Sequence, residues 1–407
     1  MRVLLVNAFH YLKGGVERTY LDESRWLSAA GHDVAHLAIR DPRNLPSPTA
    51  AYFAPPADFG EGAPALRQLA QLPRALWSVP AARAMGQVLR AFGPEIAHLH
   101  APSRYLTPSI LRPLERAGVP TVMTLHDFKP WCTNRIMFAH GTTCERCRGG
   151  THWHALATGC VQGSRLKSAV GTLEAYTHDA VRAYRHVRRW IAPSQFVFEK
   201  ALEWGVARES LRVLKHGVEQ VKADADEIAI PDRPYVLFAG RLSVEKGVAM
   251  LPALAAALGA TPLLVAGEGP LRATLERASS GTSALRVLGH LSDAALARLR
   301  AHAAAVVVPS LFYEHFCYTA AEALLDRRPV VASRIGAIPE LIEHETTGLL
   351  VPPGDAAALI AAVKRALEDP AAAAWGAAGE ERVRRVADPA RHVNALLSIY
   401  RETIAAP

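Results

Sequence analysis

Short apolar segments that alternate with helix-patterned segments place the strongest constraint on how this chain can fold. They form two series, which are separated by a polar and weakly patterned stretch at residues 220–233. The expected strands are residues 2–7, 33–39, 95–100, 121–125 and 190–192 in the first series, and 235–239, 262–266, 285–288, 305–308, 329–332 and 348–351 in the second. Strands that alternate with helices favour parallel sheets covered by helices on both faces. The pattern therefore predicts an α/β protein with two Rossmann-like, doubly wound domains.

The order of these segments also sets the expected domain boundaries. A chain of 407 residues is too long for one typical core. We expect an N-terminal domain at 1–220, a C-terminal domain at 221–388, and a last helix at 389–407 that packs back on the N-terminal domain. Residues 42–80 are expected to form a long irregular connection with at most short helices. Two such domains facing each other place the ends of their sheets around a central cleft, where these folds bind ligands.

Charge and hydropathy narrow the setting in which the protein works. The 46 lysine and arginine residues exceed the 38 aspartate and glutamate residues, which gives a formal net charge of +8. This charge suits nucleic acid, an anionic membrane surface or a phosphorylated substrate, and does not choose among them. The apolar segment after Met1 is too short for a signal peptide, and no apolar run approaches the ~20 residues of a membrane span. We expect a cytoplasmic protein, with association with the inner face of the membrane left open.

The strongest local signal is a pair of glutamates that follows the strand expected at 305–308. Glu314 and Glu322 are eight positions apart, with Glu314 in the loop after the strand and Glu322 in the first turns of the next helix. Carboxylates placed at the end of a parallel strand can accept hydrogen bonds from the hydroxyls of a sugar or a ribose. Two solvated glutamates are the alternative for an arbitrary pair at this spacing.

The motifs around this pair resemble those of the retaining glycosyltransferases of family 4, which have the GT-B fold. The resemblance covers nearly the whole chain, and its parts are Gly14-Gly15-Val16, His126-Asp127, Gly240-Arg241, Glu245-Lys246-Gly247, Gly267-Glu268-Gly269-Pro270, the segment 314–322 and the segment 336–340. It implies transfer of a sugar, with retention of anomeric configuration, from a UDP- or GDP-linked donor to a saccharide or lipid-linked acceptor. The N-terminal domain would bind the acceptor and the C-terminal domain the donor. Synthesis of an envelope polysaccharide or a glycolipid is the implied role.

The resemblance also assigns roles to individual residues. It implies that Glu314 holds hydroxyls of the transferred sugar and that Arg241 and Lys246 bind the diphosphate, where two cations stabilise the leaving group's negative charge. His126 would contact the sugar near the reacting carbon, with Asp127 a candidate for orienting it. The residues implied to bind the donor are Gly14, Gly15, Gly240, Glu268, Phe316, Cys317 and Glu322, the last through the nucleotide ribose. No catalytic metal is expected.

Two positions depart from the family pattern. Cys317 stands where the family commonly has glycine, and Ala337 replaces the second glycine before Ile338-Pro339-Glu340. A side chain at either position could narrow the phosphate or sugar pocket. The resemblance therefore predicts donor binding better than donor preference.

Four cysteines cluster in an insertion near residues 128–165. They are Cys132, Cys144, Cys147 and Cys160, with a C-x2-C pair in the centre. In a cytoplasmic chain this spacing favours a tetrahedral zinc site over disulfides, and four thiolates would close the coordination sphere, so the zinc would be structural. Free thiols are the alternative, and His140, His152 or His154 could replace one cysteine as a ligand.

Residues 165–189 are expected to form an amphipathic helix with a basic side. An apolar stripe would contain Leu173, Tyr176, Ala180, Tyr184 and Val187, opposite a face with His178, Arg182, Arg185 and Arg189. The basic side is either a solvated outer face or a surface for anionic lipid headgroups that brings a lipid-linked acceptor to the site.

Two other functions are compatible with parts of this sequence. A nucleotide-sugar epimerase with a related two-domain fold is the nearer alternative, and a zinc-containing nucleic-acid-binding protein is the further one, because it leaves the glutamate motif unexplained. The loop at Gly14-Gly15 lacks the full G-x-G-x-x-G fingerprint, which makes a nicotinamide dehydrogenase a weaker hypothesis. We expect a nucleotide sugar rather than a nucleic acid as the ligand.

Overall fold

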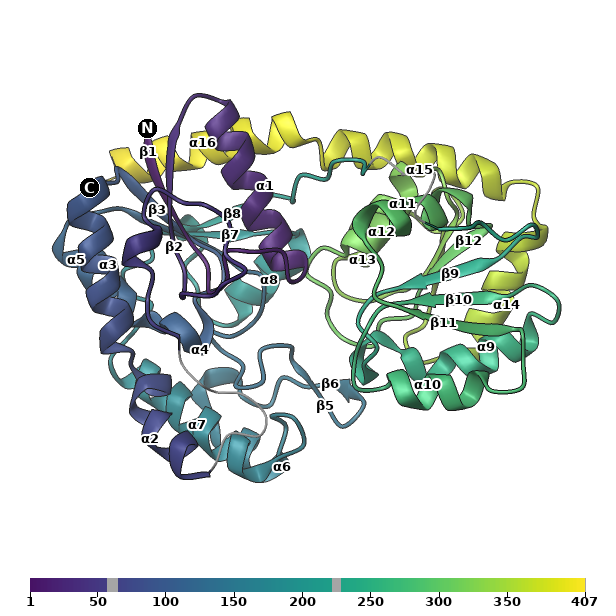
Figure 1. Ribbon diagram of the computed structural model, residues 1–407, viewed down its shortest axis with the longest axis horizontal. Helices are drawn as coiled ribbons and strands as arrows, with labels where there is room; N and C mark the ends of the chain where they lie inside the picture. Colours follow the sequence, from purple (N-terminus) through teal and green to yellow (C-terminus); the bar gives the residue numbers. More distant parts are fainter. Residues whose placement is uncertain (57–64, 222–227, 407) are drawn as a thin grey trace. The chain divides into compact units, whose positions relative to one another are not determined.

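The computed structural model describes residues 1–56, 65–221 and 228–406. The chain divides into two compact units (Figure 1). Unit 1 contains Met1–Met137, Cys144–His216 and Ala390–Pro407, and unit 2 contains Phe138–Thr143 and Gly217–Pro389. Each unit is built on a six-stranded sheet whose neighbouring strands are all parallel. This is the α/β architecture that the alternating pattern predicted.

The sheet of unit 1 has the order β2-β1-β3-β4-β7-β8. Its strands are β1 (Arg2–Val6), β2 (Asp33–Leu37), β3 (Ile96–Leu99), β4 (Thr121–Thr124), β7 (Arg189–Ala192) and β8 (Leu211–Val213). The α-helices of unit 1 are α1 (Gly15–Ala29), α2 (Ala65–Leu76), α3 (Val79–Phe92), α4 (Ser103–Leu106), α5 (Leu111–Arg116), α6 (Trp153–Thr158), α7 (Arg165–Ala180), α8 (Gln195–Glu203) and α16 (Pro389–Ala405).

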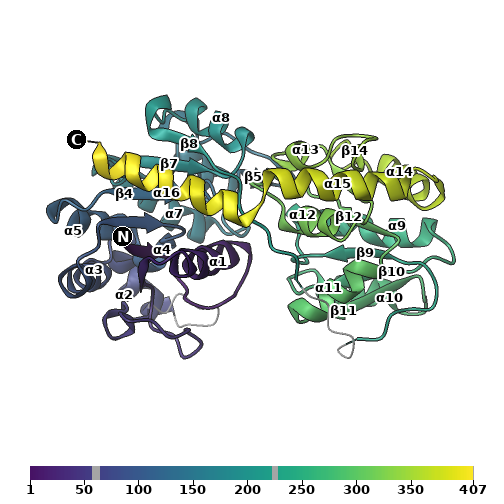
Figure 2. The ribbon, with the colours of Figure 1, turned by 90° about the horizontal axis from the view of Figure 1, so that it is seen from above.

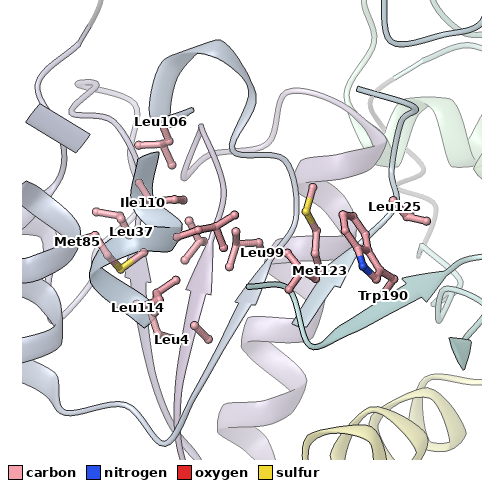
Figure 3. Packing of buried hydrophobic residues seen from close by; sticks show 14 of the residues in the cluster. Leu4, Leu37, Met85, Leu99, Leu106, Ile110, Leu114, Met123, Leu125 and Trp190 are labelled. Carbon is pink, nitrogen blue, oxygen red and sulfur yellow. The ribbon is translucent and has the colours of Figure 1, made fainter. Parts of the chain in front are cut away.

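The strands of unit 1 are buried on both faces, as crossover helices require. Successive side chains of β1 point to opposite faces, so Leu4 and Val6 join one hydrophobic cluster while Val3 and Leu5 join another. The first cluster lies under α3, α5 and α8, and Figure 3 shows Met85, from α3, among the strand residues it packs against. The second cluster lies under α1 and α16, and Figure 2 shows α16 crossing the strands of this unit. The last helix therefore belongs to the core of the unit that contains the first strand.

The sheet of unit 2 has the order β11-β10-β9-β12-β13-β14. Its strands are β9 (Val236–Ala239), β10 (Leu263–Ala266), β11 (Leu285–Gly289), β12 (Ala305–Val308), β13 (Val330–Ser333) and β14 (Leu349–Val351). The α-helices are α9 (Leu251–Ala257), α10 (Arg272–Ser279), α11 (Asp293–His302), α12 (Tyr318–Leu325), α13 (Ile338–Leu341), α14 (Ala356–Glu368) and α15 (Ala372–Val386). Hydrophobic clusters cover both faces of this sheet too, with α11, α12 and α15 on one face and α9, α10 and α14 on the other.

The expected strands are confirmed in both series, with β8 as an additional strand that the sequence analysis missed. The connection predicted at 42–80 is wrong in one respect, because residues 65–76 form the 12-residue helix α2. Residues 57–64 of that connection, and 222–227 of the stretch between the two series, lie outside the described residues. A short hairpin of β5 (Phe138–Ala139) and β6 (Thr142–Thr143) lies within the cysteine-bearing insertion. Among the described residues, no helix is long and apolar enough to cross a membrane.

Helix α7 is shorter than the amphipathic helix predicted at 165–189, and the face that it buries is not the predicted one. Helix α7 ends at Ala180, Arg182 has the non-helical φ of 44°, and Arg189 opens β7, so the predicted basic face does not form. The buried face of α7 contains Ser168, Gly171, Thr172, Glu174 and His178. The physical reason is close packing: a Cβ on Gly171 would lie 2.6 Å from Thr133 Cγ2, and Lys129 Nζ donates to Glu174 Oε2 at 2.8 Å. The expected apolar stripe is instead exposed at Leu173 (53%) and Tyr176 (40%).

Candidate active site

The loop after β12 carries the first of the two glutamates. Glu314 is buried, and its Oε1 accepts two hydrogen bonds, from Ser310 Oγ at 2.6 Å and from Lys246 Nζ at 2.7 Å. Within the residues that the structure describes, no hydrogen bond reaches the second carboxylate oxygen, Oε2. One oxygen is thus held by the protein while the other can accept a hydrogen bond from a ligand hydroxyl.

Lys246 is positioned for this contact by a tight turn. It ends the 3-10 turn Val244–Lys246, and Gly247 follows with a φ of 72°. A Cβ at Gly247 would lie 1.9 Å from the carbonyl oxygen of Pro309, so only glycine allows this approach of the two loops. Burial disfavours the charged ammonium, but the Glu314 carboxylate more than offsets this and raises the pKa of Lys246. The Lys246 side chain is 29% exposed, so it can also reach an anionic ligand.

Gly336 supports Glu314 from the neighbouring loop. Its φ is 58°, and a Cβ would lie 2.5 Å from both the backbone nitrogen and the backbone oxygen of Glu314. The next residue, Ala337, donates its N–H to the Glu314 carbonyl at 2.8 Å. Ala337 departs from the family pattern, but it is only 1% exposed. Its methyl group therefore offers a ligand almost no contact surface.

Cys317 opens helix α12 in an unfavourable backbone conformation. Its φ of 71° lies in the left-handed region, where a residue with a Cβ is strained. Cys317 and Phe316 both belong to the buried hydrophobic cluster under α12, so their side chains are part of the core. Any contact of these two residues with a sugar donor would therefore be made by their backbone atoms. Burial, followed by the nearby charge of Glu314, raises the pKa of Cys317 to about 12 and keeps it a neutral thiol.

Glu322, the second glutamate, is held by an arginine that the sequence analysis did not identify. Arg300 at the end of α11 donates to Glu322 Oε2 at 2.9 Å and to Asp326 Oδ2 at 2.6 Å. The three side chains are 3%, 11% and 5% exposed, respectively. A buried cation between two carboxylates fixes the position of Glu322. Arg300 could have been identified only from its contacts with Glu322 and Asp326 in the folded protein.

The other predicted donor residues lie at strand ends of unit 2. Gly240 follows β9 and donates its N–H to Ala266 O at 3.0 Å, and Arg241 beside it is exposed. Glu268 follows β10, pairs with Arg272 and accepts a hydrogen bond from His290 N at 3.2 Å. The structure thus brings Lys246 and Glu314 into direct contact, whereas Arg241 and Glu268 have no contact with either that is recorded in the described part of the chain.

In unit 1, Gly14 and Gly15 form the exposed N-terminal end of α1. Gly14 is the N-cap, its backbone is extended, and no side chain caps the helix. The first N–H groups of a helix lack intrahelical partners and carry a partial positive charge, which suits an anion. The nearby Glu17 is buried and accepts a hydrogen bond from Asn7 at 3.2 Å, and burial raises its pKa.

His126 follows β4 and lies against two other histidines. Its Nε2 is 3.0 Å from His100 Nδ1, and its ring stacks on His216 with centroids 5.1 Å apart. Burial is the main cause that lowers the pKa of His126 to about 3, so the ring is neutral near pH 7. Asp127 instead accepts the backbone N–H of Lys129 at 2.9 Å, so His100 is the partner of His126 and the suggested orienting role of Asp127 finds no support. His126, Asp127 and Lys129 line a hollow in the surface of unit 1.

The four cysteines of the insertion are all free. Tetrahedral zinc with Zn–S bonds near 2.3 Å needs sulfurs about 3.8 Å apart, but no three of the four sulfurs lie within 4.8 Å of one another in the described ranges. Burial raises the pKa of Cys132 to about 12, and its Sγ donates to Asn134 Oδ1 at 3.0 Å. His152 is already engaged, with its Nε2 2.8 Å from Asp179 Oδ2. The geometry therefore gives no support to the predicted zinc site.

Comparison with known families gives two matches that together span most of the chain. Glycosyltransferase Family 4 matches residues 13–221, and the family described as Glycosyl transferases group 1 matches residues 233–369. The two matches fall on the two series of strands, and they contain Gly14, His126, Lys246, Glu314 and Glu322.

Individual relatives match shorter parts. A glycogen synthase of Mycobacterium tuberculosis is 41% identical over 145 residues, covering 34% of this chain and 35% of the relative. A GDP-mannose-dependent alpha-mannosyltransferase of the same species is 29% identical over 279 residues, covering 67% and 64%. The chain spans little more than a third of the length of the curated relatives it matches first.

The fold is shared with solved structures over the full length. The structure of HepE from Anabaena, in complex with UDP-glucose, has a TM-score of 0.70 at 17% identity and covers 99% of this chain and 100% of its own. At this identity the likeness shows the fold alone, which is GT-B, as the sequence predicted.

Proposed function

Because this chain belongs to glycosyltransferase family 4, we propose that it transfers a glycosyl group from a nucleotide-diphosphate sugar to an acceptor hydroxyl with retention of configuration. The observation that carries this proposal is the contact of Lys246 with Glu314. It combines a cation suited to a leaving diphosphate with a carboxylate whose Oε2 can accept a sugar hydroxyl.

The donor roles follow from the residues of unit 2. Lys246 and the exposed Arg241 bind the diphosphate, and their attraction to it grows as the glycosidic bond breaks and negative charge collects on the leaving group. Glu314 holds hydroxyls of the transferred sugar. Glu322 binds the nucleotide ribose, with Arg300 fixing the carboxylate. The name of one relative specifies GDP-mannose and one structural neighbour contains UDP-glucose, so we propose a UDP- or GDP-linked donor.

Unit 1 supplies the remaining roles. The N–H groups at Gly14 and Gly15 face phosphate, and His126 contacts the sugar near the reacting carbon. No catalytic metal is required, because Lys246 and Arg241 supply the positive charge that the leaving group needs. These assignments follow the family resemblance residue by residue.

The acceptor is a saccharide or a lipid-linked saccharide of the cell envelope, and we place the membrane contact on helices α6 and α7 in place of the predicted basic face. The α6–α7 apolar surface is defined by five exposed side chains, Trp153 (53%), Leu156 (43%), Leu166 (72%), Leu173 (53%) and Tyr176 (40%). Its aromatic members adjoin each other, since Tyr176 Oη accepts the backbone N–H of Trp153 at 3.2 Å. Aromatic and leucine side chains beside exposed Arg165 and Lys167 suit the boundary of an anionic bilayer.

Donor binding is tested by thermal stabilisation with UDP, GDP, ADP and their sugar conjugates. A ligand at 100 times its Kd adds about 2.7 kcal/mol of stability. We expect a shift selective for one nucleotide, reduced in Arg241→Ala and Lys246→Met and retained in Arg277→Ala, an exposed arginine on α10. The anomeric configuration of the product, read by NMR from the selected donor, tests retention. A folded protein that no nucleotide stabilises contradicts the proposal.

The membrane contact is tested by flotation with vesicles of phosphatidylcholine alone or with phosphatidylglycerol. The variant Leu166→Ser/Leu173→Ser should lose binding to the anionic vesicles. Leu45→Ser is the control and should retain it, because Leu45 lies outside these helices and is 48% exposed, close to the 53% of Leu173. Equal binding by all three proteins would exclude the α6–α7 apolar surface.

A further inference from the structure

A buried carboxylate connects the first and last helices of unit 1 to the histidine of the candidate site. Glu23 lies on α1, His100 follows β3, His126 follows β4, and His392 lies on α16. We propose that Glu23 is a positioning residue that acts through His100 to fix the tautomer of His126, so that His126 presents an unprotonated Nδ1. The consequence for catalysis rests on the proposed function, whereas the tautomer itself does not.

One side of Glu23 is neutralised by His392. Both ring nitrogens of His392 face acceptors, since Nδ1 is 2.7 Å from the Lys215 carbonyl oxygen and Nε2 is 3.1 Å from Glu23 Oε1. A ring with two acceptors needs two N–H groups, which is the imidazolium form. Burial opposes that charge, but the hydrogen bond and attraction from Glu23 prevail and raise the pKa of His392. Glu23, 1% exposed, therefore remains an ionised carboxylate.

The other oxygen of Glu23 faces two histidines of the sheet. Oε2 is 3.3 Å from His98 Nδ1 and 3.4 Å from His100 Nε2. His98 has further partners, with Tyr400 Oη 2.8 Å from its Nδ1 and Thr124 Oγ1 2.7 Å from its Nε2. His100 Nε2 is fully buried and has no aligned hydrogen-bond partner in the described part of the chain, so the Glu23 carboxylate is the polar group that decides its protonation.

The tautomer of His126 follows from this contact by counting protons. Burial is the largest cause that lowers the pKa of His100, so its ring is neutral and carries one N–H. An ionised carboxylate only accepts, so the proton is on His100 Nε2 and its Nδ1 keeps a lone pair. That lone pair lies 3.0 Å from His126 Nε2, which must therefore be the donor. Since neutral His126 also has a single N–H, its Nδ1 is an acceptor suited to a sugar hydroxyl.

A metal ion is the alternative occupant of this cluster. The ligand atoms of Glu23, His98 and His100 lie within 4.8 Å of one another. Metal on His100 Nε2 would move the ring proton to Nδ1 and make His126 Nε2 the acceptor, which is the opposite tautomer. The hydrogen bonds of Glu23 Oε1 to His392 and of His98 Nδ1 to Tyr400 favour the metal-free network.

The test compares wild type with Glu23→Leu by long-range ¹H–¹⁵N spectra of protein labelled at histidine, with His126 assigned through His126→Gln. Wild type should show His126 protonated at Nε2. Glu23→Leu removes the acceptor that faces His100. A proton on His100 Nε2 would then be a buried donor without an acceptor, so it moves to Nδ1, which faces His126, and His126 becomes protonated at Nδ1. Glu23→Asp keeps a carboxylate and should keep the wild-type tautomer.

Activity gives a second, separable result. Loss of one hydrogen bond to the sugar corresponds to roughly a tenfold fall in kcat, with nucleotide binding by unit 2 unchanged. An unchanged His126 tautomer in Glu23→Leu overturns the inference while leaving the proposed function intact. If Glu23→Leu does not fold, His126 protonated at Nδ1 in wild type is sufficient to overturn it. Stoichiometric zinc in wild type that is lost in Glu23→Leu also overturns it, in favour of the metal site.

Discussion

Replacing Arg300 should destabilise unit 2 more than any surface charge in the same unit. The guanidinium is 3% exposed and bonds to Glu322 and Asp326, which are nearly as buried. In Arg300→Met the apolar packing of the side-chain stem is largely kept, but two carboxylates lose their shared cation. Removing one partner of a buried ion pair costs about 3–5 kcal/mol, which for a unit of this size lowers Tm by roughly 6–20 °C.

Calorimetric unfolding of matched variants measures this effect. Arg384→Met is the control, because Arg384 pairs with Glu380 at 2.9 Å on the surface of α15 and is 56% exposed; such a pair is worth about 0–1 kcal/mol. The variant Arg300→Met/Glu322→Gln/Asp326→Asn removes the uncompensated charge and should recover much of the loss. If Arg300→Met costs no more stability than Arg384→Met, the buried network does not fix Glu322.

Three further predictions concern single positions. Cys317→Gly should be more stable than Cys317→Ala by about 1 kcal/mol, seen as Tm, because glycine accepts the φ of 71° that strains any residue with a Cβ; equal Tm values would show that no strain is stored there. Gly336→Ala should abolish nucleotide-induced stabilisation, whereas Gly281→Ala, with a φ of 82° but nothing within 4 Å of its Cβ, should cost only backbone strain and retain the nucleotide effect. The pKa of His392 is raised because the contact with its buried carboxylate outweighs burial, so its contribution to stability is complete below the unfolded pKa of about 6.5 and is lost as pH rises through the folded value. The Tm difference between wild type and His392→Gln should therefore narrow from about pH 6 to pH 9, and a constant difference would refute the charged pair.

The strands could be predicted because a parallel strand buried on both faces is a continuous apolar run, as at β9 and β12. The loop that contains Glu314 could be located for the same reason, since it begins where the strand ends. The side-chain partners of the site residues could not be predicted from the sequence. Arg300 sits on a polar-looking helix, and its burial is decided by how α11 packs beside α12. Likewise His392 and Glu23 are 369 positions apart, and nothing local in either segment indicates the contact.

The predicted face of α7 failed for a related physical reason. Periodicity marks the apolar side of a helix, but the side that is buried is set by what packs against it. Gly171 allows Thr133 to approach closely, and the Lys129–Glu174 pair satisfies the charge that this packing buries. The buried face of α7 therefore consists of small residues and paired polar residues, while Leu173 and Tyr176 are exposed.

The course of the chain through the two units bears on the order of synthesis and folding. All six strands of the unit 1 sheet precede Gly217–Pro389, the main segment of unit 2, yet Val393, Leu396 and Tyr400 of α16 complete the cluster around Val3 and Leu5. During synthesis from the N-terminus, one face of the first sheet must therefore wait for the last helix to leave the ribosome, while unit 2 already has its full sequence. The second unit to be made is in this sense the first that can finish folding, and the first sheet keeps an apolar face uncovered in the interval.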